Sequence, residues 1–95
     1  MATYVALINW TDQGIRDYKA TSARADAFAT LLEGLGGKVR ELLWTIGPYD
    51  IVGILEAPDD ETITAAALKL GSLGNVRTTT LRAFNRDELT AILAK

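Results

Sequence analysis

The fold of this chain is decided by residues 42–55, which read LLWTIGPYDIVGIL. Two runs of aromatic and branched apolar residues flank the short segment GPYD at positions 47–50, in which Gly and Pro are typical of a turn. The pattern predicts one strand over about residues 38–46 and a returning strand across residues 49–57. The same turn sets a phenol beside a carboxylate at the point where the two strands meet.

Outward from this hairpin, the chain shows the same order of elements on each side. Residues 3–10 are aromatic and β-branched and predict a strand, which a short lead-in joins to a helix ending at paired glycines. On the other side, the acidic run at residues 58–61 predicts the start of a helix, and a strand follows over residues 75–84. Asn85 then opens a terminal helix.

This β-α-β-β-α-β order with an added helix predicts an α+β, ferredoxin-like fold. We expect one domain over residues 1–95, with an antiparallel four-stranded sheet, helices on one sheet face and a C-terminal helix. The glycines at positions 34, 36 and 37 end a helix rather than open one, so they do not form a phosphate-binding loop. No cofactor is expected.

The strands are apolar on both faces. Along residues 3–10, Tyr4 and Ile8 lie on one face, whereas Val5 and Leu7 lie on the other. A sheet covered by helices on one face only should alternate apolar and polar residues, and this chain has too little helix to cover both faces. We therefore expect a second copy to cover the other face, in a sheet-packed homo-oligomer built from dimers.

Composition narrows the functional classes. The 95-residue chain carries a formal net charge of −2 with acids and bases interspersed, so it has no basic field for nucleic acid or an anionic membrane. It has neither cysteine nor histidine, which excludes disulfides, thiol nucleophiles, zinc-type sites and the usual proton shuttle near pH 7. No acidic loop has a spacing suited to a metal ion.

The expected location is cytoplasmic. No apolar run approaches the roughly 20 residues that span a bilayer. The first four residues lack the basic region of a signal peptide.

Four short motifs together resemble the GYD domain family. They are TDQG at residues 11–14, GPYD at 47–50, APDDE at 57–61 and GNVRT at 74–78. The resemblance implies a bacterial protein with the dimeric α/β-barrel type of ferredoxin-like fold. It implies no particular activity, because the family has no settled biochemical role.

The GPYD segment supplies the first candidate site residues. On the predicted strand, Tyr49 and Asp50 are neighbours and point to opposite faces, so they do not form one catalytic pair. Asp50 either accepts N–H bonds from the turn or a neighbouring strand, or it lines a pocket with Arg77 or Arg24. Tyr49 is either a packing aromatic with its hydroxyl at an edge or a proton donor.

Arg77, at the opening of the predicted last strand, has two possible roles. Its guanidinium could clamp a carboxylate or phosphate through two parallel bonds. Alternatively, it forms an ion pair with Asp50 or Glu56 that fixes strand geometry or a subunit contact.

The aromatic residues also fit either a ligand site or structural packing. Trp10, Trp44, Tyr4 and Phe84 either line a pocket for a flat ligand or pack in an interface between sheets. Asn9, beside Trp10 at a strand end, either fixes a ligand or bridges to the following turn.

Three functions remain open from the sequence. The first is a small oligomeric domain that binds a small molecule or acts as a regulatory or assembly module. The alternative is a cofactor-independent enzyme resembling small dimeric α/β-barrel monooxygenases or isomerases, with Asp50, Tyr49 and Arg77 as its candidate groups. The third is a purely structural assembly module. A closed pocket with convergent Arg and Asp side chains would favour binding or catalysis.

Overall fold

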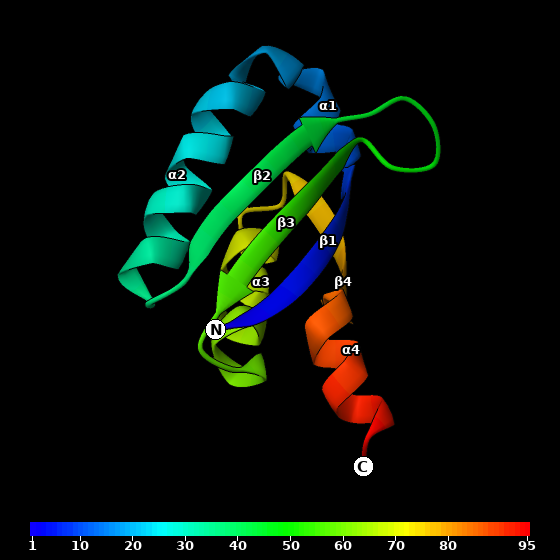
Figure 1. The fold of residues 1–95 in the computed structure, drawn as a ribbon. Helices are drawn as coiled ribbons and strands as arrows, with labels where there is room; N and C mark the ends of the chain where they lie inside the picture. Colours follow the sequence, from blue (N-terminus) through cyan, green and yellow to red (C-terminus); the bar gives the residue numbers. More distant parts are fainter.

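The computed structural model describes residues 1–95 and contains the predicted order of strands and helices (Figure 1). The elements in chain order are β1 (Ala2–Trp10), α1 (Asp12–Arg16), the 3-10 turn η1 (Tyr18–Ala20), α2 (Thr21–Gly34), β2 (Lys38–Trp44), β3 (Ile51–Ala57), α3 (Asp60–Ser72), β4 (Val76–Ala83) and α4 (Arg86–Leu93).

The four strands form one antiparallel sheet in the order β2-β3-β1-β4. Ile8 in the central strand β1 lies opposite Ile51 of β3 and Thr78 of β4. This strand order with α2 and α3 as crossovers is consistent with the ferredoxin-like fold, and the predicted α+β class is confirmed.

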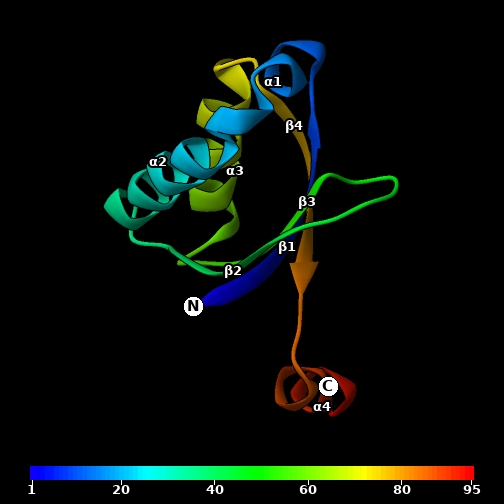
Figure 2. The same cartoon turned by 90° about the horizontal axis from the view of Figure 1, so that it is seen from above.

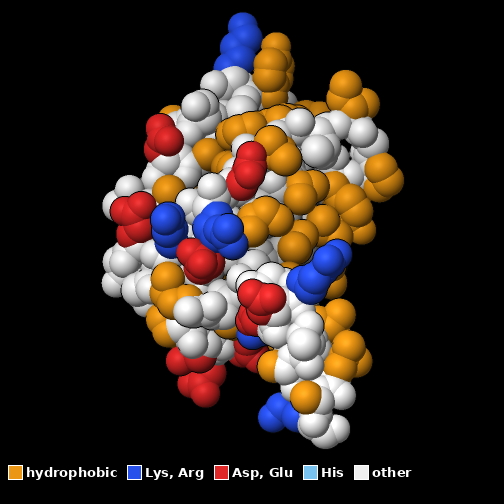
Figure 3. Space-filling view, viewed as in Figure 1, with side chains coloured by type: hydrophobic (Ala, Val, Ile, Leu, Met, Phe, Trp, Pro, Cys, Tyr) orange, Lys and Arg blue, Asp and Glu red, His pale blue; other side chains and the backbone are white.

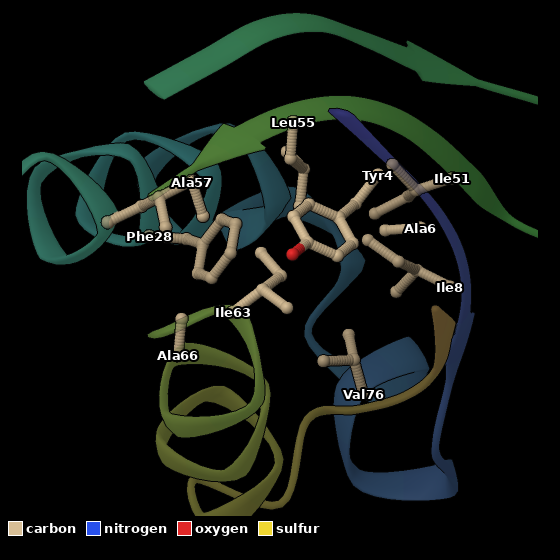
Figure 4. Close-up of a cluster of buried hydrophobic side chains, with 11 residues drawn as sticks. Tyr4, Ala6, Ile8, Phe28, Ile51, Leu55, Ala57, Ile63, Ala66 and Val76 are labelled. Atoms are coloured by element: carbon tan, nitrogen blue, oxygen red, sulfur yellow. The ribbon is translucent and has the colours of Figure 1, made fainter. Parts of the chain in front are cut away.

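The core lies between the sheet and the two helices α2 and α3, which cover the same sheet face (Figure 2). Because side chains alternate along a strand, every second residue of β1 and β3 points into this layer. Figure 4 shows side chains from the strands and from both helices converging there. The buried cluster consists of Tyr4, Ala6, Ile8, Phe28, Leu32, Ile51, Leu55, Ala57, Ile63, Ala66 and Val76.

The helix starts follow the sequence signals with one exception. Thr11, Asp59 and Asn85 cap α1, α3 and α4 by accepting hydrogen bonds from backbone N–H groups of the first turn. Helix α2 is the exception, because no side chain caps its start. That helix continues directly from the 3-10 turn, which leaves no free side-chain cap position.

The hairpin between β2 and β3 is wider than predicted. The strands end at Trp44 and restart at Ile51, so residues 45–50 form a loop. Gly47 has a φ of 137°, outside the range of a strand residue with a side chain, and Pro48 has no N–H to donate to a ladder. The predicted extension of the two strands to residues 46 and 49 is therefore wrong, because Gly47 and Pro48 interrupt the strand pairing.

Two segments extend beyond the sheet. The 45–50 loop projects on the side away from the helices, and α4 stands apart at the end of β4 (Figure 2). The side chain of Ile46 on the loop is fully exposed, and Leu89, Ile92 and Leu93 on α4 are also exposed. The terminal helix therefore carries apolar residues that are not packed into the core. None of the helices is both long and apolar enough to cross a membrane.

Candidate functional site, an uncovered sheet face

The sheet face opposite α2 and α3 is covered by no element of the chain (Figure 2). We call it the open face, and its apolar members come from all four strands. Strand register places them beside one another, since Val5 lies between Ile54 and Leu81, and Val52 lies between Leu7 and Leu43. The open face consists of Val5, Leu7, Leu43, Val52, Ile54 and Leu81.

The centre of the open face is apolar, and its charges lie at the margin. Leu43 is 52% exposed and Leu81 is 47% exposed, although both are large apolar side chains. Figure 3 shows apolar side chains gathered over the strands and up to the projecting loop. Lys38 and Glu56 form a cross-strand pair towards one end of the same face. An apolar centre with a charged rim is the usual anatomy of a protein interface.

Asp50 is held by the backbone of β1. Its carboxylate Oδ2 accepts a hydrogen bond from the N–H of Trp10 at 2.8 Å, and its own N–H donates to the Ile8 carbonyl at 2.9 Å. The Asp50 carbonyl accepts from the Thr45 N–H at 2.8 Å. Of the two alternative roles for Asp50, the structure shows the structural one, in which the carboxylate accepts a hydrogen bond from an N–H of a neighbouring strand.

Tyr49 and Asp50 do not lie on a strand. Both are half-buried residues of the 45–50 loop, so the expectation that strand alternation sends them to opposite faces is wrong. The Tyr49 carbonyl accepts a hydrogen bond from Thr45 Oγ1 at 2.6 Å, which closes the loop. A proton-donor role for the Tyr49 hydroxyl stays a prediction.

Arg77 and Asp50 are not brought together. Arg77 lies opposite Asn9 on the edge strand β4, and strand β1 separates it from Asp50. The ion pair of Arg77 with Asp50 or Glu56, one of its two alternative roles, is not formed within the chain, where the single ion pair joins Arg82 to Glu88 at 3.9 Å. The exposed Arg77 instead borders a groove between β4 and α3.

Arg24 is not a partner of Asp50 either. Its guanidinium donates to the carbonyls of Gly14 and Asp17, each at 3.1 Å, and so ties α2 to the segment that precedes it. No group of three or more Asp or Glu side chains gathers where it could hold a metal ion.

The four aromatic residues do not line one pocket. Trp10 lies on the helix side of the sheet, whereas the Trp44 indole N–H donates to Thr21 Oγ1 at 3.0 Å. Tyr4 belongs to the core, and Phe84 is exposed beyond β4. The pocket for a flat ligand, one of the two alternatives for these residues, is therefore not formed by the four together, because strand register spreads them over both ends of the sheet.

Sequence reasoning missed a contact between Tyr4 and Asp60. The Tyr4 hydroxyl donates to Asp60 Oδ1 at 2.5 Å, across the start of α3. Burial, the hydrogen bond to Asp60 and the charge of that carboxylate raise the pKa of Tyr4 to about 12. The guanidinium of Arg82 lies 5.6 Å from the centre of the same ring. The acidic helix start at residues 58–61 was the only sequence signal for this contact.

Comparison with known proteins supports one family assignment. The model of the GYD domain matches residues 4–93. A Thermus thermophilus protein named "Glutamine synthetase and cystathionine beta-lyase binding protein" is 35% identical over 94 residues, covering 98% of this chain and 99% of that protein. The crystal structure of TTHA0845, also from Thermus thermophilus, superposes with a TM-score of 0.57 at 29% identity, covering 90% of this chain and 95% of the other.

Proposed function

The chain belongs to the GYD domain family, and we propose that it is an oligomeric protein-binding module that regulates or assembles other proteins. The observation that carries the proposal is the uncovered apolar face of the sheet. Contiguous apolar surface of this kind is stabilised when another protein surface removes it from water. The cytoplasmic location and bacterial origin expected from the sequence are part of the same proposal.

The first occupant we assign to the open face is a second copy of this chain. The face carries no charge at its centre, so two copies can meet there without like-charge repulsion or burial of an unpaired charge. Its rim carries both signs, with Lys38 opposite Glu56 and with Glu41 opposite Ile54. Such a rim allows opposite charges to meet around a two-fold axis.

The two projecting segments support the same occupant. Ile46 on the loop and Leu89 on α4 expose apolar side chains that find no partner within the chain. Both segments extend past the sheet, so a copy seated on the open face would lie within their reach (Figure 1). One chain thus carries both the surface to be covered and apolar groups able to cover part of it.

Binding to an enzyme is the second part of the proposal, and the resemblance to the Thermus protein motivates it. That protein is named as binding glutamine synthetase and cystathionine beta-lyase. We extend to this chain the general role of a protein that binds an enzyme. The rival enzymatic function has weaker support, since its candidate groups Asp50 and Arg77 are separated by β1.

Self-association is tested with a matched pair of substitutions. Leu43→Asp places a charge on the open face, whereas Leu68→Asp places one on α3, where the leucine is 69% exposed. We expect sedimentation velocity at micromolar concentration to show a dimer-based oligomer for the unmodified protein and Leu68→Asp, and a monomer for Leu43→Asp. A stable monomer of the unmodified protein would overturn the assignment of a second copy.

The enzyme partner is tested separately, with purified glutamine synthetase and cystathionine beta-lyase from the same source. Isothermal titration calorimetry should give saturable binding to at least one of them. Absence of binding to both enzymes would reject this part of the proposal and leave the assignment of a second copy standing.

A further inference from the structure

Strand β4 forms an edge of the sheet. It pairs with β1 alone, so about half of its backbone N–H and C=O groups point away from the sheet. None of the backbone hydrogen bonds outside the regular elements involves residues 77–82. Such an edge is a template on which an extended peptide can add one more strand.

A groove of about 770 Å³ runs along this edge, between β4 and α3. The buried side chains of Tyr4 and Ile63 lie at its base, and Figure 4 shows them close together. The wall formed by α3 includes Leu68, a large apolar side chain that is mostly exposed. The groove therefore combines unpaired backbone groups with apolar surface, which are the two features that bind an extended peptide.

The two ends of the groove differ in charge. At one end, Arg82 forms an ion pair with Glu88 at 3.9 Å. Asp60, the only acidic residue of the lining, lies at the same end, because it accepts from the hydroxyl of Tyr4, the cross-strand neighbour of Arg82. At the other end, Arg77 has no ion-pair partner. This second end therefore attracts a negative charge.

The Arg77 end is also where the two walls of the groove join. Helix α3 ends at Ser72 and β4 begins at Val76, so only residues 73–75 connect the walls there. An extended chain lying in the groove ends at this connection, and the negative group that a chain carries at its end is the C-terminal carboxylate. A guanidinium can bind a carboxylate through two parallel hydrogen bonds.

Length sets the size of the occupant. Arg77 and Arg82 are five residues apart on β4. At about 3.3 Å for each strand residue, the groove between them is about 17 Å long and holds about five extended residues. The last residues of this chain form α4, so the five residues come from another protein.

We propose that this groove binds the C-terminal tail of a partner protein, as a short strand antiparallel to β4 with its terminal carboxylate on Arg77. The proposal rests on the proposed role of the chain in binding proteins and adds a second surface to it. Since the groove lies at the sheet edge on the helix side, it does not include the residues of the open face.

The test uses two peptides that differ at one group, acetyl-KTVTV with a free C-terminal carboxylate and acetyl-KTVTV with a C-terminal amide. Isothermal titration calorimetry with the full chain should show about tenfold tighter binding of the free acid, the range of one hydrogen bond to a charged group. Arg77→Gln should remove this preference. Arg40→Gln, on the opposite edge strand β2, should retain it.

A second pair of variants separates this groove from the open face. Leu68→Asp places a carboxylate on the groove wall, so it should abolish binding of the free acid and leave the oligomer unchanged. Leu43→Asp should dissociate the oligomer and bind the free acid normally. Circular dichroism verifies that each variant is folded, and amide hydrogen exchange over residues 77–82 should slow when the free acid binds.

Three results would each overturn the proposal. They are equal affinity for the two peptides, no binding of either peptide, and a preference for the free acid that Arg77→Gln retains. Each of these results would leave the assignment of a second copy to the open face standing, because sedimentation velocity tests that assignment without a peptide.

Discussion

The carboxylate of Asp50 and the backbone N–H of Trp10 are joined by a hydrogen bond of 2.8 Å at the point where β1 and β3 separate. The Asp50 N–H donates in turn to the carbonyl of Ile8, two residues earlier on β1. The side chain thus takes the place of a strand carbonyl and extends the sheet by one bond past the last regular pair. The acid of the GPYD segment has a structural task in the fold.

Asp50→Ala should lower the free energy of unfolding by about 1–3 kcal/mol, because the half-buried Trp10 N–H then loses its acceptor. Asp50→Asn retains an oxygen that can accept this hydrogen bond, so it should lower the free energy of unfolding by less. Urea unfolding measures both effects. Asp26→Ala, at an exposed position of α2, serves as the control and should change stability by less than about 0.5 kcal/mol. Equal midpoints for Asp50→Ala and the control would contradict this role.

Gly14→Ala should destabilise the fold by about 1–3 kcal/mol or more, since α1 packs tightly against the start of β4. A Cβ at Gly14 would lie 1.9 Å from the carbonyl oxygen of Asn75. Gly71 is the matched control, because it lies within α3 and a Cβ there would meet nothing within 4 Å. Gly71→Ala should stabilise the protein by about 0.5–1 kcal/mol through helix propensity. The midpoint temperature of thermal unfolding should therefore fall for Gly14→Ala and rise for Gly71→Ala. A shift in the same direction for both variants would contradict this account.

Tyr4 should make stability fall in alkaline solution. Its pKa is raised from an ordinary value near 10 to about 12, so between these values the unfolded chain releases the phenolic proton while the folded chain retains it. The contribution of Tyr4 is therefore complete below pH 10 and is lost as pH rises towards 12. Denaturant unfolding at pH values from 8 to 12 should show that the free energy of unfolding falls more steeply with pH for the unmodified protein than for Tyr4→Phe. Parallel curves for the two proteins would rule out a raised pKa at this residue.

The sequence predicted the fold because its signals were local. Alternation in β1 distinguished Tyr4 and Ile8 from Val5 and Leu7, and the structure places these pairs on opposite sheet faces. Capping by Asp59 was equally visible, since it depends on residues within one helical turn.

The candidate site depended on distances that the sequence does not contain. The bond from Trp10 to Asp50 spans 40 residues, and the bond from Tyr4 to Asp60 spans 56. Both hydrogen bonds depend on the register between paired strands, and the identity of one residue does not determine that register. The loop at residues 45–50 was missed for another reason, because Gly47 and Pro48 fit a tight turn as well as a wide one.

The terminal helix should be ordered by association rather than by the chain alone. Helix α4 has 8 residues, which is too short for a stable isolated helix, and its Leu89, Ile92 and Leu93 are exposed. If a second copy covers these side chains, amide hydrogen exchange over residues 88–93 should slow as protein concentration rises from nanomolar to micromolar.

Asn85→Ala should weaken this association. The substitution removes the capping box that Asn85 forms with Glu88 and costs the helix about 1 kcal/mol, equivalent to roughly a fivefold rise in the dissociation constant for each helix that must reform. Asp59→Ala, which removes the cap of α3, should lower stability without changing the dissociation constant. Exchange at residues 88–93 that is equally fast at every concentration, together with unchanged association of Asn85→Ala, would show that α4 takes no part in the interface.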